Sequence, residues 1–236
     1  MKGATPAGAA NEQEAARWVR AMFGRVAHRY DLANHLLSFN IDRRWRARAV
    51  RRVGPTLARP GARALDLCCG TGDLLVALGA ARTVGADFCH PMLVRARQKG
   101  ARRLVEADAL SLPFPAACFD AVTAAFGFRN LANYEAGLAE IRRVLRPGGM
   151  LAILEFSQPP HAVFGALYNF YSRRILPLIG GALSGSRDAY TYLPESVRRF
   201  PSVEELAAMI RAAGFRDAGY ERMTGGIVAL HTGIAA

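Results

Sequence analysis

Two aspartates and a glycine turn are the residues of this chain whose types and spacing best suit ligand chemistry. A short apolar run that carries Asp66 leads directly into the turn Cys68-Cys-Gly-Thr-Gly72. Gly70 and Gly72 permit a tight turn that comes close to a ligand, because no Cβ blocks the approach. A helix-like apolar pattern resumes at 74–78, so that the first N–H groups of a helix point toward the same ligand. The unit predicts the start of a nucleotide-binding α/β domain, with a purely structural turn as the alternative.

The second aspartate, Asp87, narrows the class of ligand. It ends the next apolar run, 83–87, about 20 residues after Asp66, which is a spacing typical of a carboxylate that accepts hydrogen bonds from a ribose diol. The full dinucleotide motif is absent, since Cys68 and Leu75 stand where its first and third glycines belong. A ligand with a ribose and no pyrophosphate fits this turn better than NAD does. S-adenosylmethionine is the commonest ligand of that kind, and we expect it as the cofactor.

Alternating strands and helices position these residues. We predict strands at 63–67, 83–87, 102–106, 119–126 and 150–156, with helices at 74–78, about 90–99 and 134–145 between them, and a last antiparallel pair at 215–221 and 227–231 on the sheet edge. The expected fold class is therefore α/β, a Rossmann-like and mostly parallel sheet with an antiparallel last strand and helices on both faces. Ligands bind such sheets at the carboxyl ends of the strands, where the turn, Asp87, Asp108 and 126–130 all fall.

The remaining segments suggest how the chain is divided. Residues 1–10 read as a flexible lead, and 11–236 as a single domain. Within that domain, 11–53 forms a helical extension, with helices at 11–29 and 42–53; Asn40 caps the second helix, and Gly54-Pro55 ends it.

The segment 162–200 interrupts the alternation and reads as a lid or substrate insertion. Apolar residues recur along 162–179 at helical steps, which suits a lid, a membrane-facing helix or a core helix. A polar linker is expected at 184–199.

Composition and charge exclude several classes of protein. Hydrophobic residues make up 51% of the 236 residues, which is enough for a sizeable core. The sequence has no apolar run of transmembrane length and no apolar signal core, and its four cysteines lack metal-binding or C-x-x-C spacing. We expect a cytoplasmic protein without a metal. The net charge of +12 comes almost entirely from Arg, and the basic stretch 17–52 suits acidic lipid, nucleic acid or simply solvent.

Five segments in this order resemble the class I S-adenosylmethionine-dependent methyltransferases: LDLCCGTGD, GADFCHPML, EADALSLPFP, FDAVTAAFGFRNL and VLRPGGMLAILEF. Segments 22–46, 126–130 and 187–201 are similar to the quinone C-methyltransferases of menaquinone and ubiquinone biosynthesis. The resemblance runs from about residue 20 to about residue 233. It implies C-methylation of a prenylated quinol, most closely the conversion of demethylmenaquinol to menaquinol.

The resemblance also implies roles for individual residues. Thr71, Asp87, Asp108 and Ala109 match cofactor positions, with Asp87 at the ribose and Asp108 and Ala109 at the adenine. Asp66, Gly70 and Gly72 of the first unit complete the expected cofactor-binding set.

The catalytic residues follow from their place beside the cofactor. Arg129 and Asn130 are candidates to stabilise a developing phenolate. Tyr30 and Asp31 are candidates for ring orientation or proton transfer, together with Asn34, Tyr190 and Tyr192, although each tyrosine is equally suited to ordinary packing.

Two rival substrates stay open on sequence grounds. The pair Cys68-Cys69 looks like the menaquinone branch, and Ala125 stands where ubiquinone-branch relatives often carry Ser, yet a ubiquinone-pathway benzoquinol is not excluded. The family also often carries His at the position of Asp42. O-methylation of a small phenol would use the same cofactor site. A nucleic-acid partner is not expected, because neither an Asp/Asn-Pro-Pro-aromatic motif nor a Pro-Cys nucleophile is present.

The expected partner is a lipid quinol, which lives in a bilayer. We therefore predict transient contact with the membrane surface through 43–52 and 162–179, peripheral at the inner face, with salt-sensitive binding to anionic lipid. A homodimer is left open by the sequence.

Overall fold

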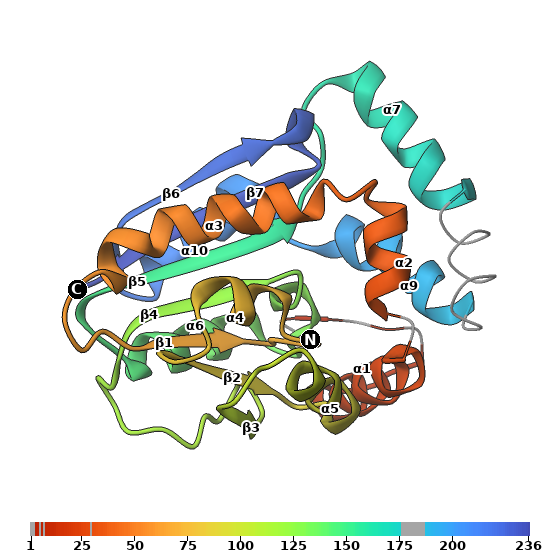
Figure 1. The fold of residues 1–236 in the computed structure, drawn as a ribbon. Helices are drawn as coiled ribbons and strands as arrows, with labels where there is room; N and C mark the ends of the chain where they lie inside the picture. Colours follow the sequence, from red (N-terminus) through yellow and green to blue (C-terminus); the bar gives the residue numbers. More distant parts are fainter. Residues whose placement is uncertain (1–2, 5, 7, 29, 176–186) are drawn as a thin grey trace.

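A seven-stranded sheet organises the part of the chain that the structure describes. The computed structural model describes residues 3–4, 6, 8–28, 30–175 and 187–236 (Figure 1). The strands are β1 (Ala64–Leu67), β2 (Thr83–Asp87), β3 (Leu104–Glu106), β4 (Phe119–Ala125), β5 (Leu145–Phe156), β6 (Phe215–Met223) and β7 (Val228–Ala235). Their order is β3-β2-β1-β4-β5-β7-β6. The first five pair in parallel, and β7 runs antiparallel to both β5 and β6. The predicted Rossmann-like α/β class is confirmed.

Helices cover both faces of this sheet. They are α1 (Glu12–Val26), α2 (Tyr30–Leu37), α3 (Asp42–Leu57), α4 (Asp73–Leu78), α5 (His90–Gln98), α6 (Tyr134–Val144), α7 (Ala162–Phe170), α9 (Arg187–Arg199) and α10 (Val203–Ala212), with short turns η1 (Phe128–Asn130), η2 (Tyr171–Ile175) and η3 (Thr224–Gly226).

Strand β5 contributes side chains to the hydrophobic cores on both faces of the sheet, because successive side chains of a strand point to opposite faces. Leu151 and Ile153 pack in the cluster of α6 and α10, while Ala152 and Leu154 pack in the cluster of α3 and α4.

Helix α3 begins where it was predicted, but its cap and its carboxyl end differ from the prediction. It begins at Asp42 after Ile41, and Asn40 lies in the turn before it with a left-handed φ of 58° instead of capping the helix. The helix also continues through Pro55 to Leu57. Pro55 costs one backbone hydrogen bond, but the buried Val53 and Thr56 on either side hold this last turn against the sheet.

The predicted polar linker at 184–199 is also wrong where the structure describes it. Residues 187–199 form α9, which buries Tyr192, Ser196 and Val197 on one side. The polar side chains that suggested a linker occupy its other positions. Strand β5 also begins earlier than the predicted residue 150, at Leu145, and it includes Gly148 with a left-handed φ of 76°.

Helices α1 and α2 lie beyond the carboxyl ends of the strands, together with α9, whereas α3 runs along one face of the sheet (Figure 1). Helix α1 begins where the Asn11 side chain accepts a hydrogen bond from the Glu14 N–H. Val26 at its end packs against Met92 of α5, with Tyr30 of α2 beside them. Helices α1 and α2 therefore cover the edge of the sheet where ligands bind in such folds. No helix in the described residues is both long and apolar enough to span a bilayer.

Candidate active site

The glycine turn after β1 has two glycines with different functions. Both have left-handed backbones, with φ of 54° at Gly70 and 85° at Gly72. A Cβ on Gly70 would meet nothing within 4 Å, and the residue borders a pocket at the carboxyl edge of the sheet. A Cβ on Gly72 would lie 3.1 Å from the Ala96 Cβ, so this glycine faces α5 and does not line that pocket. The backbone is therefore open toward the pocket at Gly70, whereas Gly72 packs against α5.

Six of the seven predicted cofactor residues line this pocket, which we call the cofactor pocket: Asp66, Gly70, Thr71, Asp87, Asp108 and Ala109. Asp87 is fixed at the end of β2, since its Oδ2 accepts from the Gly70 N–H at 2.8 Å and its Oδ1 from the Cys89 N–H at 2.9 Å. Burial raises the pKa of Asp87 to about 6, and these backbone bonds act in the opposite direction. A carboxylate held so rigidly at a strand end suits a ribose diol.

Asp66 has a buried carboxylate oxygen that could accept a hydrogen bond from a ligand. It is 1% exposed, and its Oδ1 accepts from the Thr123 hydroxyl at 2.7 Å. Its Oδ2 has no hydrogen-bond partner among the described residues. Burial raises the pKa of Asp66 to about 7, against the hydrogen bond from Thr123. An orphaned buried acceptor beside an open glycine backbone fits the cationic and hydroxyl groups of S-adenosylmethionine.

Asp108 and Ala109 form the far wall of the cofactor pocket. The Asp108 Oδ1 accepts from the Leu110 N–H at 2.9 Å, which holds the turn that follows β3. Ala109 is buried and small, and it leaves room for a flat ring. This placement is compatible with the predicted adenine contacts.

Asp31 lies in a different place from that expected of a ring-orienting residue. It lines neither this pocket nor the neighbouring one described below. It accepts a hydrogen bond from the Thr71 hydroxyl and pairs with Lys99 Nζ at 2.6 Å. Lys99 also pairs with Asp73 at 2.6 Å. Asp31 thus fastens α2 to the glycine turn.

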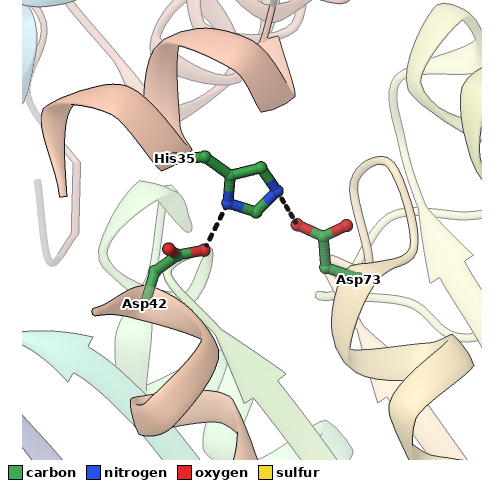
Figure 2. A group of neighbouring side chains, drawn as sticks. All are labelled: His35, Asp42 and Asp73. Carbon is green, nitrogen blue, oxygen red and sulfur yellow. Dashed lines mark hydrogen bonds and ion pairs between the residues drawn. The ribbon is translucent and has the colours of Figure 1, made fainter. Parts of the chain in front are cut away.

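A second set of ion pairs continues this attachment (Figure 2). His35 Nδ1 lies 2.8 Å from Asp42 Oδ2, and His35 Nε2 lies 4.0 Å from Asp73 Oδ2. Arg46 pairs with both aspartates. Burial acts to raise the pKa of Asp42, but the Ser38 hydroxyl and Arg46 outweigh it, so the pKa is lowered.

The ligand atoms of His35, Asp42 and Asp73 lie within 4.8 Å of one another, a spacing that suits a metal ion. However, Arg46 and Lys99 already supply positive charge to these carboxylates. We interpret the cluster as a set of structural contacts that hold α2 and α3 against the glycine turn.

An apolar cavity of about 370 Å³ lies beside the cofactor pocket. The two share Phe23, Tyr30, Arg46 and Phe126 as lining residues. The Phe126 and Phe156 rings pack at a tilt with their centroids 4.7 Å apart, and the Trp45 ring centroid lies 5.9 Å from that of Phe126. Tyr30 therefore stands at the boundary where a bound ring would meet the cofactor.

Turn η1 presents one candidate catalytic residue to each space. Arg129 lines the apolar cavity, and Asn130 lines the cofactor pocket. The Asn130 Oδ1 accepts from the Tyr192 hydroxyl at 3.1 Å. Tyr192 is buried and lines the apolar cavity. The side chains of Asn34 and Tyr190 lie outside the described residues.

Arg129 is buried, and other groups of the protein hold its Nη1 and Nε. Its Nη1 lies 2.9 Å from Glu155 Oε1 and also donates to the Phe126 carbonyl. Its Nε donates to the Ser196 hydroxyl at 3.3 Å. Burial lowers the pKa of Arg129, but the charge of Glu155 outweighs that effect and the pKa is raised, so the guanidinium stays charged. Glu155 was missed by the sequence analysis; the sign was a carboxylate inside the apolar run Met150–Phe156.

Comparisons with known proteins show the family to which the chain belongs. The model of the ubiE/COQ5 methyltransferase family matches residues 9–235. A demethylmenaquinone methyltransferase of Thermus thermophilus is 52% identical over 90% of this chain and 99% of its own length. A relative of the same name from Deinococcus radiodurans is 48% identical over 94% and 95%. A ubiquinone/menaquinone biosynthesis C-methyltransferase of Syntrophotalea carbinolica is 46% identical over 91% and 92%.

Solved structures share the fold at lower identity. A SAM-dependent methyltransferase of Thermotoga maritima superposes with a TM-score of 0.65 at 19% identity, over 92% of this chain and 99% of that one. Sequence, fold and pocket thus lead to the same assignment: the chain is an S-adenosylmethionine-dependent methyltransferase and belongs to the ubiE/COQ5 methyltransferase family.

Proposed function

We propose that this enzyme methylates a ring carbon of a prenylated quinol and converts demethylmenaquinol to menaquinol. The observation that carries the proposal is the apolar cavity, which shares Phe23, Tyr30, Arg46 and Phe126 with the cofactor pocket. A ring in this cavity reaches the cofactor through a common wall while its tail stays among apolar side chains. The names of the relatives at about half identity support the same substrate class.

The reaction needs little acid–base chemistry at the methyl group. S-adenosylmethionine, when bound, supplies a methyl group on a sulfonium, which is already a good leaving group. The ring carbon forms the new carbon–carbon bond as the methyl–sulfur bond breaks, and the ring carbon then loses its proton to a base. The protein must hold the ring in line and keep water away. Phe126, Phe156 and Trp45 provide the dry aromatic wall for this purpose.

Arg129 stabilises the negative charge that develops on a quinol oxygen. Arg129 lines the cavity and its guanidinium is held by Glu155, so it requires no rearrangement as charge develops. Asn130, on the cofactor side of the same turn, fixes the orientation of Tyr192 through their hydrogen bond. Tyr30 orients the ring, since it lines both spaces. In this arrangement Asp31 positions α2 and makes no contact with the ring.

A peripheral membrane contact brings the enzyme to its substrate. The chain carries a net charge of +12, and α3 exposes Arg43, Arg44, Arg51 and Arg52. A basic surface gains about 1 kcal/mol per Arg near anionic lipid, and salt screens this attraction. We infer that the enzyme works at the inner face of the membrane.

Quinone analysis in cells tests the proposed substrate. Deletion of the gene should abolish menaquinone and accumulate its demethyl precursor, both of which mass spectrometry resolves. An unchanged menaquinone level would contradict the proposal. Accumulation of an unmethylated ubiquinone precursor, or loss of a small O-methylated phenol, would favour the two alternatives.

A further inference from the structure

We propose that the α2–α3 turn and α7 form a portal that enters an anionic bilayer and admits the tail of the lipid substrate to the apolar cavity. We call the exposed apolar side chains of these two segments the portal surface: Leu36, Phe39, Val163, Phe164, Leu167 and Phe170. Their exposure ranges from 37% to 78%, and they are six of the nine large apolar side chains exposed among the described residues. This inference rests on the proposed lipid quinol substrate.

The two segments lie side by side at the opening of the cavity. The Tyr171 hydroxyl, just after α7, donates to the Leu37 carbonyl at the end of α2 at 3.0 Å. Phe39, Phe164 and Leu167 line the cavity and are also exposed to solvent. The cavity therefore opens between the segments, at a place that is apolar on the inside and on the outside.

Contacts at its amino-terminal end hold α7 in its exposed position. Phe164 packs so tightly on η3 that a Cβ on Gly225 would lie 2.5 Å from its Cε1. A Cβ on Gly226 would similarly lie 2.6 Å from Pro160 Cδ, just before the helix. Figure 1 shows α7 projecting past the end of the sheet, with α2 below it. The base of α7 is thus anchored, while Val163, Leu167 and Phe170 face outward.

Three features favour a bilayer as the occupant of this surface. A cavity of about 370 Å³ is at the small end of ligand pockets, so a long tail must continue outside it. The portal surface is continuous with the cavity, so a tail that leaves the cavity comes out among these exposed apolar side chains. Exposed arginines flank the apolar residues, with Arg43 and Arg44 after Phe39 and Arg174 after Phe170. Apolar side chains framed by Arg are typical of segments that lie in the interface of anionic membranes.

The test uses portal residues that do not line the cavity. The portal variant combines Leu36→Ser, Val163→Ser and Phe170→Ser. The control variant combines Val76→Ser and Val94→Ser, which remove two other exposed apolar side chains far from the portal in sequence. Each protein is mixed with vesicles of phosphatidylcholine and phosphatidylglycerol, or of phosphatidylcholine alone. Sedimentation measures binding at low and high salt, and methyl transfer is measured with a vesicle-borne long-tailed quinol and with a soluble quinol that lacks the tail.

The portal variant should bind anionic vesicles about tenfold more weakly than the wild type, and its kcat/KM on the vesicle-borne quinol should fall by about the same factor. Its kcat/KM on the tailless quinol should be unchanged, as should all properties of the control variant. Equal vesicle binding by the portal variant and the wild type would overturn the proposal. An equal loss on both quinols would also overturn it, because the surface would then serve the active site.

Two further outcomes separate this proposal from its alternatives. A lipid-free dimer that the portal variant dissociates would show that a second copy covers the surface, which contradicts a membrane portal. If the wild type methylates neither quinol, the proposed function fails, whereas the vesicle-binding comparison still decides the portal.

Discussion

Arg129 and Glu155 form a buried ion pair beside the apolar cavity, with Nη1 2.9 Å from Oε1. They meet because β4 and β5 are paired: Arg129 lies in η1, which follows β4, and Glu155 lies near the end of β5. Glu155 also accepts from the Arg129 and Phe156 backbone N–H groups, at 3.2 Å and 2.9 Å. The pair fixes both the backbone of η1 and the guanidinium direction. Removal of either charge leaves the other buried and unpaired, which costs about 3–5 kcal/mol in typical proteins.

This pair predicts a separation between turnover and cofactor binding. We expect Arg129→Ala to lower turnover at saturating cofactor by at least tenfold, because the developing charge on the quinol oxygen loses its partner. Calorimetry should show nearly unchanged S-adenosylmethionine affinity. Ser196→Ala is the matched control, since it removes only the 3.3 Å contact to Nε. Turnover of Arg129→Ala within a factor of about two would make the arginine purely structural.

Glu155→Gln tests whether the carboxylate positions Arg129. The amide retains an acceptor of the same shape but leaves the buried guanidinium without a counter-charge. We expect a loss of about 3–5 kcal/mol in the free energy of unfolding, measured by urea denaturation, and a fall in turnover without a matching rise in KM. A variant of full stability and full turnover would refute the positioning role.

Asp87 predicts a pH-dependent cofactor affinity. Because its pKa is raised to about 6, the carboxylate is charged above that pH and accepts well from a ribose. Affinity should therefore fall as the pH drops through about 6, and Asp87→Asn should remove that part of the dependence. A change in cofactor affinity near pH 7 that remains in Asp87→Asn would come from the titration of Asp66, whose pKa is raised to about 7. Asp87→Ala should cost about 1.5–3 kcal/mol of binding, the usual loss for hydrogen bonds to a charged group. Equal affinity of Asp87→Ala and the wild type in calorimetry would rule out the ribose contact.

Asp66 predicts a change of stability in the opposite pH direction. Burial raises its pKa from 3.8 to about 7, so folding favours the protonated form. The contribution to stability is fully present below about pH 4 and is lost as the pH rises through about 7. Without cofactor, Asp66→Asn should be more stable than the wild type above that pH by roughly 2–4 kcal/mol, with a smaller gap near pH 5. Parallel urea-denaturation curves at both pH values would exclude a buried charge.

The two glycines of the turn predict different losses. Gly70→Ala places a methyl group in open space beside the cofactor pocket at a left-handed residue, so it should weaken cofactor binding at a stability cost of about 1–2 kcal/mol. Gly72→Ala presses on Ala96 at 3.1 Å and should destabilise more, without filling the pocket. Thermal unfolding and calorimetry on both variants check this contrast. The reverse pattern would contradict the assignment of Gly70 to the ligand.

The sequence allowed the sheet and the cofactor pocket to be predicted because both follow local rules. Asp66, Asp87 and Asp108 each stand at or next to a strand end, and parallel strands bring their carboxyl ends to one edge. The linker proposed at 184–199 was wrong because α9 buries a narrow stripe among polar residues. Gly72 was assigned to the ligand by spacing, whereas its packing on Ala96 depends on α5, which lies about 20 residues further along the chain.

Contacts between residues that are far apart in the sequence could not be predicted. Arg129 was recognisable as a candidate, but its partner Glu155 is 26 residues away and becomes a neighbour only through the pairing of β4 and β5. Lys99 similarly meets Asp31 across the fold. The exposure of Phe39 and Leu167 depends on which surfaces the other helices leave uncovered. No local pattern encodes these relations.

The central claim is methyl transfer to a quinol ring carbon, and an isotope experiment tests it most directly. The purified chain is incubated with S-adenosylmethionine deuterated at its methyl group and with demethylmenaquinol in vesicles, and the extracted lipid is analysed by tandem mass spectrometry. The account predicts menaquinone whose ring fragment carries all three deuterons, in amounts that grow with enzyme and vanish with Asp87→Ala at limiting cofactor. A label on oxygen, or none on any quinone, would contradict it.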